Sequence, residues 1–324
     1  MPQPTPLDVH VNRPLTNISV AYQQAASKYI ADRVFPRVPV SKQTDQFFTY
    51  PKGEWFRTDA QVRAPATESA GSGYTLSTDT YRCEVYAVHK DIDDQTRANA
   101  DQPINLDREA TQFVTNQLLL KRDKDWATNF LTTGVWDKDL TGVSGTPSTN
   151  QFKQWDDAAS DPIQTVQDAA LDVERSTGFK PNTLVLGPDV WNQLRNHGDI
   201  LDRIKYTQRG IVTEALVAAV FDVDRILVAR AIENSANEGA TASMDFMVGK
   251  SALLCYSAPN PGLMTPSAGY TFTWSGLLGA SAFGSRITNF RIPITKVDRI
   301  EGEMAYDQNV IASDLGTFFA SVVA

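Results

Sequence analysis

Cysteine and histidine are scarce in this sequence. Its 324 residues include two cysteines, Cys83 and Cys255, and no C-x-x-C pair. That excludes a disulfide-stapled secreted scaffold and fits a reducing cytosol. The three histidines, His10, His89 and His197, do not stand at metal-ligand spacing. We therefore expect no metal site and no cofactor.

Long apolar runs are also absent. No stretch approaches the roughly 18 residues that a membrane span needs, and the proline-containing N-terminus lacks the apolar core of a signal peptide. The net charge of −8 repels phosphate, so we expect no tight binding of nucleic acid. The hydrophobic share of 42% nevertheless allows a buried core, and the length allows two packed subdomains.

Catalytic motifs fail at decisive positions. The Gly249–Ser251 segment ends like a phosphate-binding loop, but Met244 stands where its first glycine belongs. Asp91, Asp93 and Asp94 lack the glycine and glutamate of a calcium loop, which favours a solvated strand exit. A Ser-His-Asp triad stays open because triads assemble in space, although no G-x-S-x-G elbow supports one. We predict that the chain is not an enzyme.

The first 45 residues predict an arm rather than a domain. Prolines at positions 2, 4, 6 and 14 prevent regular structure at the start. A helical pattern follows at about Val20–Val34, and its apolar residues need a surface to pack on. Prolines at positions 36 and 39 end it.

Residues 46–93 predict a long two-stranded excursion. The first strand is expected at about Gln46–Thr58, and the return strand alternates apolar and polar residues over Tyr81–Val88. The segment between them, residues 60–73, is small, polar and glycine-containing. A tip of this composition cannot bury itself in its own core, so we expect the hairpin to project and to contact a neighbour.

A long helix is predicted over residues 104–133. Asn105 suits its N-cap, acidic residues follow in the first turn, and Gly134 is placed to end it. From residue 160 to 258, helices and short apolar strands alternate, which indicates a compact α/β unit. His197 precedes Gly198, where we expect it to cap a helix C-terminus. The last 65 residues turn β-rich.

This order of elements resembles the Hong Kong 97 fold of tailed-bacteriophage major capsid proteins. Pro181–Trp191 and Asp199–Lys205 are similar to the stretch of those proteins where a strand meets a helix in the axial domain. Val297–Val310 and Ala312–Gly316 are similar to their closing strands and tail. The implied fold class is α+β, a Hong Kong 97-type capsid fold with an N-arm, an extended β-hairpin (E-loop), a peripheral domain with a long spine helix and an α/β axial domain.

The resemblance also implies a domain scheme and a function. The N-arm would span 1–45, the E-loop 46–93, the peripheral domain 94–159, the axial domain 160–258, and the return strands with the tail 259–324. The expected function is a structural subunit that self-assembles into hexamers and pentamers of an icosahedral phage head enclosing double-stranded DNA. It would be made in the host bacterial cytoplasm and end in the virion.

The resemblance points further to partners and contacts. Because only about 45 residues precede the hairpin, we expect a separate scaffolding protein, together with a portal and possibly decoration proteins. Arg57, Asp59, Arg63 and Glu68 are the candidate intersubunit contacts of the hairpin. Lys52 lies near the hairpin base, so the lysine cross-link of one member of this fold is not carried over. Two alternatives stay open: an encapsulin-like cellular shell, and a cytosolic α/β hydrolytic enzyme.

Overall fold

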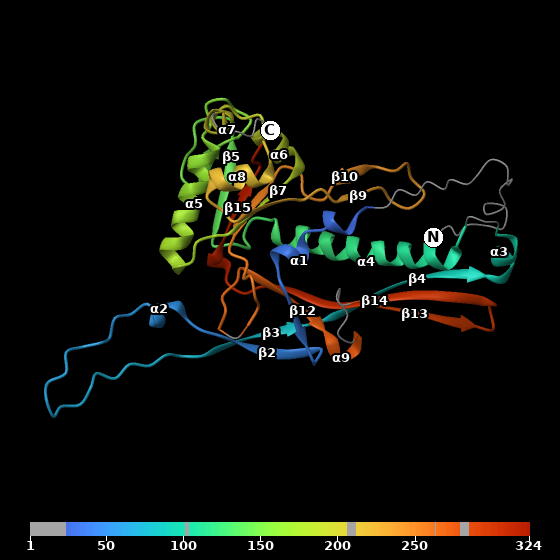
Figure 1. The fold of residues 1–324 in the computed structure, drawn as a ribbon, viewed down its shortest axis with the longest axis horizontal. Helices are drawn as coiled ribbons and strands as arrows, with labels where there is room; N and C mark the ends of the chain where they lie inside the picture. Colours follow the sequence, from blue (N-terminus) through green and yellow to red (C-terminus); the bar gives the residue numbers. More distant parts are fainter. Residues whose placement is uncertain (1–23, 101–103, 206–211, 263, 279–284) are drawn as a thin grey trace.

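The computed structural model describes residues 24–100, 104–205, 212–262, 264–278 and 285–324. A long helix, α4 (Leu106–Phe130), runs along one lobe, a second lobe stands at its C-terminal end, and a hairpin projects away from both (Figure 1). The Asn105 side chain accepts the Arg108 N–H at 3.1 Å and so caps α4 as predicted. The helix ends at Phe130, before Gly134.

The first lobe places α4 on a five-stranded sheet. Strand β14 is its long central member and pairs with β4 on one edge and with β13 and β12 on the other. Gly302 of β14 lies under the helix, where a Cβ would be 2.4 Å from the Val114 side chain and 2.9 Å from Leu118. Glycine there lets the helix approach the sheet closely. The strands are β1 (Arg37–Val40), β4 (Glu84–Asp93), β12 (Gly269–Trp274), β13 (Ser285–Ile292) and β14 (Val297–Val310).

The second lobe is a six-stranded sheet in the order β6-β5-β15-β11-β7-β8 with helices packed against it. Every residue of β7 and β11 is buried, as expected for strands covered on both faces. The sheet also takes β5, β6 and β15 from outside residues 160–258. Its strands are β5 (Lys138–Val143), β6 (Gln151–Lys153), β7 (Thr183–Leu186), β8 (Arg225–Val228), β11 (Ala252–Cys255) and β15 (Gly316–Ala320); its helices are α5 (Pro162–Thr177), α6 (Pro188–Leu194), α7 (Gly198–Ile204) and α8 (Glu214–Phe221).

The paired strands of the hairpin are shorter than the sequence predicted. Strands β2 (Thr44–Thr49) and β3 (Ser77–Arg82) pair, and beyond them the two chains separate. The prediction of a strand to Thr58 is wrong: Pro51 cannot donate to a ladder, and α2 (Lys52–Trp55) follows it. The predicted return strand is broken at Cys83. Before it, β3 pairs with β2; after it, β4 pairs with β14.

The predicted helix over residues 20–34 is also wrong in its described part. Residues 24–34 hold a 3-10 turn, η2 (Ala26–Lys28), and one helical turn, α1 (Ala31–Val34). The segment is extended at Tyr29, because Tyr29, Ile30 and Phe35 are buried against the first lobe and its contacts override the local pattern. Residues 20–23 lie outside the described residues. The remaining elements are α3 (Asp94–Asn99), β9 (Ile232–Asn234), β10 (Met244–Phe246), α9 (Ser275–Leu278) and η3 (Ser313–Leu315).

Candidate assembly surface

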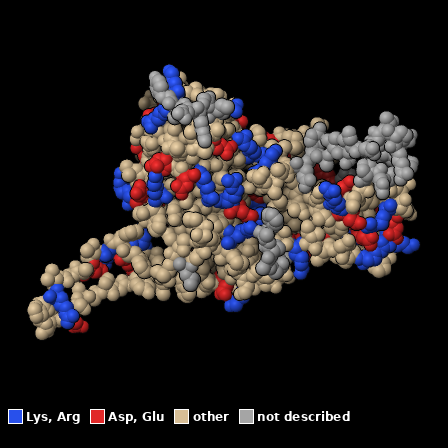
Figure 2. Space-filling model, in the orientation of Figure 1, with Lys and Arg blue, Asp and Glu red and all other residues tan. Residues whose placement is uncertain are grey.

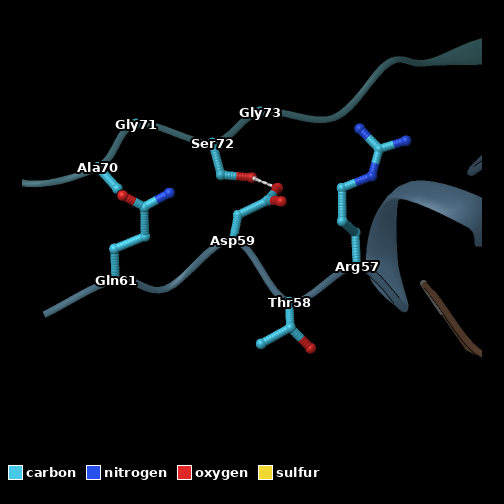
Figure 3. Close-up of a pocket in the computed structure, with 8 residues that line it drawn as sticks. All are labelled: Arg57, Thr58, Asp59, Gln61, Ala70, Gly71, Ser72 and Gly73. Carbon is cyan, nitrogen blue, oxygen red and sulfur yellow. Dashed lines mark hydrogen bonds between the residues drawn. The ribbon is translucent and has the colours of Figure 1, made fainter.

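The tip of the hairpin holds the four residues singled out from the sequence. An open cleft of about 420 Å³ lies between its two chains, lined on one side by Arg57 and Asp59 and on the other by residues 70–73 (Figure 3). Asp59 accepts a hydrogen bond from Ser72 across the cleft at 2.7 Å. Arg63 is exposed and donates to the Thr67 carbonyl. Glu68 is exposed as well, so the structure brings Arg57 and Asp59 together and leaves the other two apart.

Aromatic side chains gather in the hairpin stem, which we define as residues 48–56 and 74–76. The rings of Tyr50, Trp55 and Tyr74 contact one another at centroid distances of 5.4 to 6.1 Å. Trp55 remains 50% exposed, Tyr74 59% and Phe48 66%. Such a cluster of large exposed rings is typical of a protein interface. The sequence analysis missed it because these residues were assigned to a strand and its loop.

Three contacts hold the stem to itself and to the molecule. Glu54 accepts hydrogen bonds from the Thr75 N–H and hydroxyl group, which joins the two chains of the stem. Lys52 forms an ion pair with Asp314. A Cβ on Gly178, at the end of α5, would lie 3.2 Å from the Phe56 ring, so that ring rests on the second lobe. The stem is thus anchored at its base while its aromatic face stays open.

Charged residues interlock at the end of the first lobe farthest from the hairpin, where Figure 2 shows acidic and basic side chains interspersed. Asp94 pairs with Arg291 through two contacts of 2.6 Å, and Asp91 with Arg299 at 2.7 and 2.8 Å. These hydrogen bonds hold the pKa of each carboxyl group below its ordinary range. Asp93 caps α3 through the Thr96 N–H. The aspartates stand where β4 ends, as predicted, with Asp94 exposed and Asp91 and Asp93 partly exposed, and each is engaged in an ion pair or a helix cap.

A second ionic cluster is buried between the N-terminal segment and α4. Asp123 is 3% exposed and accepts the Ile30 and Ala31 N–H groups at 2.8 and 2.7 Å. Arg122, 4% exposed, pairs with Asp32 at 2.5 Å. The sequence analysis did not find this cluster, because two adjacent charges in a helix read as a solvated face.

A serine, a histidine and an aspartate do meet in the second lobe, although their geometry is unsuited to a nucleophile. Ser160 Oγ lies 3.2 Å from His197 Nε2, and both side chains are buried. His197 Nδ1 accepts the Asp199 N–H, so the ring proton sits on Nε2 and points at the serine. The serine hydroxyl donates to the Asp157 carbonyl. Instead of ending a helix, as expected, His197 caps the N-terminus of α7.

The remaining motifs serve packing. A Cβ on Gly187 would lie 1.7 Å from the Gly249 carbonyl oxygen. The Gly249–Ser251 segment therefore packs its backbone directly against the backbone of Gly187. Cys83 and Cys255 are buried and free, and burial raises the pKa of each thiol to about 12. Within the described residues no group of acidic, histidine or cysteine side chains could hold a metal ion. None of the described helices is long and apolar enough to cross a membrane.

Comparison with known proteins decides between the classes of function. The family model for phage major capsid protein E matches residues 145–256. The major capsid protein of Pseudomonas phage JBD67 is 29% identical over 99% of this chain and 98% of its own length. Among solved structures, a phage-related protein from Bordetella bronchiseptica aligns with a TM-score of 0.68 at 21% identity, covering 93% of this chain and 94% of its own. The capsid of cyanophage P-SCSP1u aligns with a TM-score of 0.64 at 13% identity, over 97% and 93%.

The chain is thus similar in sequence to phage major capsid proteins over nearly its whole length. Its fold is the Hong Kong 97 type of phage capsid proteins, so the fold class implied by the resemblance is confirmed. An encapsulin from Synechococcus elongatus shares the fold at a TM-score of 0.56 and 10% identity, over 96% of this chain and 95% of its own. That likeness concerns the fold alone, and the curated relatives are capsid proteins, so the encapsulin alternative is not favoured. The relatives that this chain resembles are structural proteins of the phage head.

Proposed function

We propose that this capsid protein assembles into the hexamers and pentamers of an icosahedral phage head that encloses double-stranded DNA. The observation that carries the proposal is the projecting stem. Its rings at Phe48, Trp55 and Tyr74 are half or more exposed in one subunit, although the stem is anchored to the body through Lys52 and Asp314. Large rings held in place but uncovered are suited to a surface that a second subunit covers.

The proposed contact has a centre and a rim. The aromatic residues of the stem supply the apolar centre, where burial on association contributes most. Arg57, Asp59, Arg63 and Glu68 then lie toward the tip as a polar rim that pairs with the neighbouring subunit. Exposed ion pairs contribute only about 0–1 kcal/mol each, so the rim selects the register of the contact rather than its strength.

The domain scheme extends the same proposal. The N-arm at 1–45, the E-loop at 46–93, the peripheral domain at 94–159, the axial domain at 160–258 and the return strands at 259–324 would each take the place of their counterparts in a shell. The pairing of β5, β6 and β15 with β7, β8 and β11 supports adding these three strands to the axial domain. Helix α4 is the proposed spine helix.

The proposed partners are the other proteins of a phage head and the DNA inside it. The protein is part of the virion, made in the host cytoplasm, and we propose that it works with a separate scaffolding protein, a portal and decoration proteins. Its charge of −8 supports enclosing DNA without sequence-specific binding. In the arm, Arg37 faces Asp32 at 3.6 Å and Lys42 pairs with Asp45 at 2.9 Å, so these two cations are offset by acids.

Assembly is the first expected outcome. The purified full chain, alone or co-expressed with the scaffolding and portal proteins of its phage, should yield hexamers, pentamers or closed shells, because the stem exposes rings that one subunit leaves uncovered. Light scattering and negative-stain electron microscopy measure this. A species that stays monomeric across protein and salt concentrations in both settings contradicts the proposal.

A second outcome concerns the tip. Replacing residues 60–73 by a short Gly-Ser turn should leave thermal unfolding of the isolated subunit nearly unchanged, since the replaced residues are all exposed. Shell formation should fail or give fragile shells, because Arg63 and Glu68, half of the rim, are lost from every subunit. Calorimetry of the subunit and electron microscopy of the shells report the two effects separately. If the subunit unfolds, the tip is part of its core; if normal shells form, the rim has no role.

A further inference from the structure

Residues 24–40, here called the strap, lie across both lobes as a docked segment. The Gln24 amide exchanges two hydrogen bonds with the backbone of Ile232, at 2.6 and 2.9 Å. Arg225, the first residue of β8, donates a hydrogen bond to the Arg33 carbonyl at 2.7 Å. Strand β1, at the end of the strap, pairs in parallel with β12. The strap therefore touches the spine helix, the axial sheet and the peripheral sheet. Its docking couples the two lobes.

The centre of the strap is held by a carboxylate of another element. Helix α1 begins at Ala31, and its N-cap residue is Ile30, whose own side chain cannot cap it. Asp123 Oδ1 of the spine helix accepts both the Ile30 and the Ala31 N–H and so supplies the missing cap. Asp123 is 3% exposed, so this cap is a buried acid.

The cap stands in a cluster of two acids and two bases, of which only one base is buried. Asp32 of the strap and Asp123 of the spine helix surround Arg122, the one fully buried cation among them. Arg37 reaches Asp32 only at 3.6 Å, with a side chain 31% exposed. Asp32 Oδ1 is buried without a hydrogen-bond partner. One buried carboxylate, Asp123, and one partly buried carboxylate, Asp32, share a single buried guanidinium, so the negative charge inside the cluster is only partly balanced.

We propose that this cluster makes the strap a proton-linked lock: uptake of one proton by the buried Asp32–Arg122–Asp123 cluster tightens the strap on the spine helix, and its loss loosens it. The inference does not rest on the capsid function. Undocking exposes both carboxylates to water, where they ionise freely, so the proton favours the docked state alone. The strap is the bistable element, and the proton biases it.

Burial shifts the pKa values of the acids in the cluster in the direction that the proposal needs. Burial raises the pKa of Asp123 to about 6, against the lowering effects of the Ala31 and Ile30 N–H groups and of Arg122. Burial raises the pKa of Asp32 and lowers that of Arg122. From the strap, Tyr29 faces Asp123, and burial followed by that negative charge raises its pKa to about 12. From β14, Tyr306 faces Arg122, and burial raises its pKa too, so neither phenol titrates near neutral pH.

The direction of the pH effect follows from linkage. A carboxyl group with a higher pKa in the docked state binds more protons there, so docking tightens as the pH falls and weakens as it rises through about 6. An ordinary aspartate titrates near about 3.9, so docking should strengthen about tenfold between about pH 7.5 and about pH 5.

Hydrogen exchange of the unassembled full chain tests the lock. After correction for intrinsic chemical exchange, protection of a peptide covering residues 29–35 should rise about tenfold from about pH 7.5 to about pH 5. Asp123→Asn keeps an acceptor oxygen but cannot titrate, so its strap should stay protected with a flat pH profile. Asp32→Asn removes the like charge beside Asp123 but leaves Asp123 buried, so the rise should persist there in smaller form. This variant serves if Asp123→Asn fails to fold, and a rise steeper than that of the parent would contradict the proposal.

A matched control is Asp172→Asn in α5, which removes an aspartate paired with Lys138, away from the strap. It should leave the pH profile at residues 29–35 as in the parent chain. A flat or inverted profile in the parent overturns the proposal. So does a profile that survives in Asp123→Asn, or a strap that exchanges as fast as free peptide at both pH values.

Discussion

Replacing Arg122 with alanine is expected to lower the free energy of unfolding of the unassembled subunit by about 3–5 kcal/mol. The guanidinium is 4% exposed and pairs with Asp32 at 2.5 Å. Removing it leaves Asp32 and Asp123 buried with no buried cation between them, which is more damaging than the loss of one hydrogen bond. Denaturation with urea, followed by tryptophan fluorescence, measures the change.

Two companion variants separate the causes. Arg108→Ala makes the same change on the exposed side of the same helix and should stay within about 0.5 kcal/mol of the parent. Arg122→Met combined with Asp32→Asn removes the cation and one acid together and should recover most of the loss, since less unbalanced charge stays buried. A double variant as unstable as Arg122→Ala would mean that the lost hydrogen bonds of the guanidinium, not unbalanced charge, set the effect.

The regular elements with strong local signals followed from the sequence. Helix α4 carries its own N-cap at Asn105 and a core-facing stripe at Ala110, Val114, Leu118 and Trp126, so its start and its buried face are determined locally. Helix α5 likewise has Asp161 as its N-cap and Gly178 in the left-handed region as its end. Signals of this kind need no knowledge of the rest of the chain.

Elements whose form depends on contacts with distant parts of the chain could not be predicted from the sequence. The strap carries a helical pattern, yet Asp123, some ninety positions away, decides where its one helical turn begins. The return strand alternates evenly from Tyr81 to Val88, yet it changes partner at Cys83. Tyr81 and Cys83 are buried on one side of that break, and Tyr86 is partly covered on the other, where it stacks on Tyr306. Periodicity shows that a strand exists and not which strand it joins.

The candidate site divides in the same way. Composition alone located the exposed tip, because small polar residues cannot form a core. The aromatic stem was missed because Tyr50, Trp55 and Tyr74 stand on two chains of the hairpin and meet only once it is folded. The buried ionic cluster was missed for a related reason: Arg122 and Asp123 are polar residues in the middle of the helix, and their partners come from the strap.

Replacing both Trp55 and Tyr74 with alanine is expected to abolish shell formation while the subunit stays folded. Both rings are half or more exposed, so the subunit should lose only their ring contacts with each other and with Tyr50, at 5.4 to 6.1 Å and about 1 kcal/mol each. In the proposed interface the same rings would be fully covered, and aromatic residues at an interface centre contribute about 2 kcal/mol or more each. The loss recurs in every subunit of a shell, so closure should fail. Electron microscopy and light scattering measure assembly, and urea denaturation measures the subunit.

The control removes an equally exposed apolar residue from the other lobe. Leu171 of α5 is 52% exposed, and Leu171→Ala should leave assembly near that of the parent. If the leucine variant fails to assemble as completely as the aromatic pair, assembly depends on apolar surface wherever it lies, and the stem has no special role. If the aromatic pair assembles normally, the stem is not the centre of the contact, and the tip residues Arg57, Asp59, Arg63 and Glu68 are left as the part of the hairpin that could join two subunits.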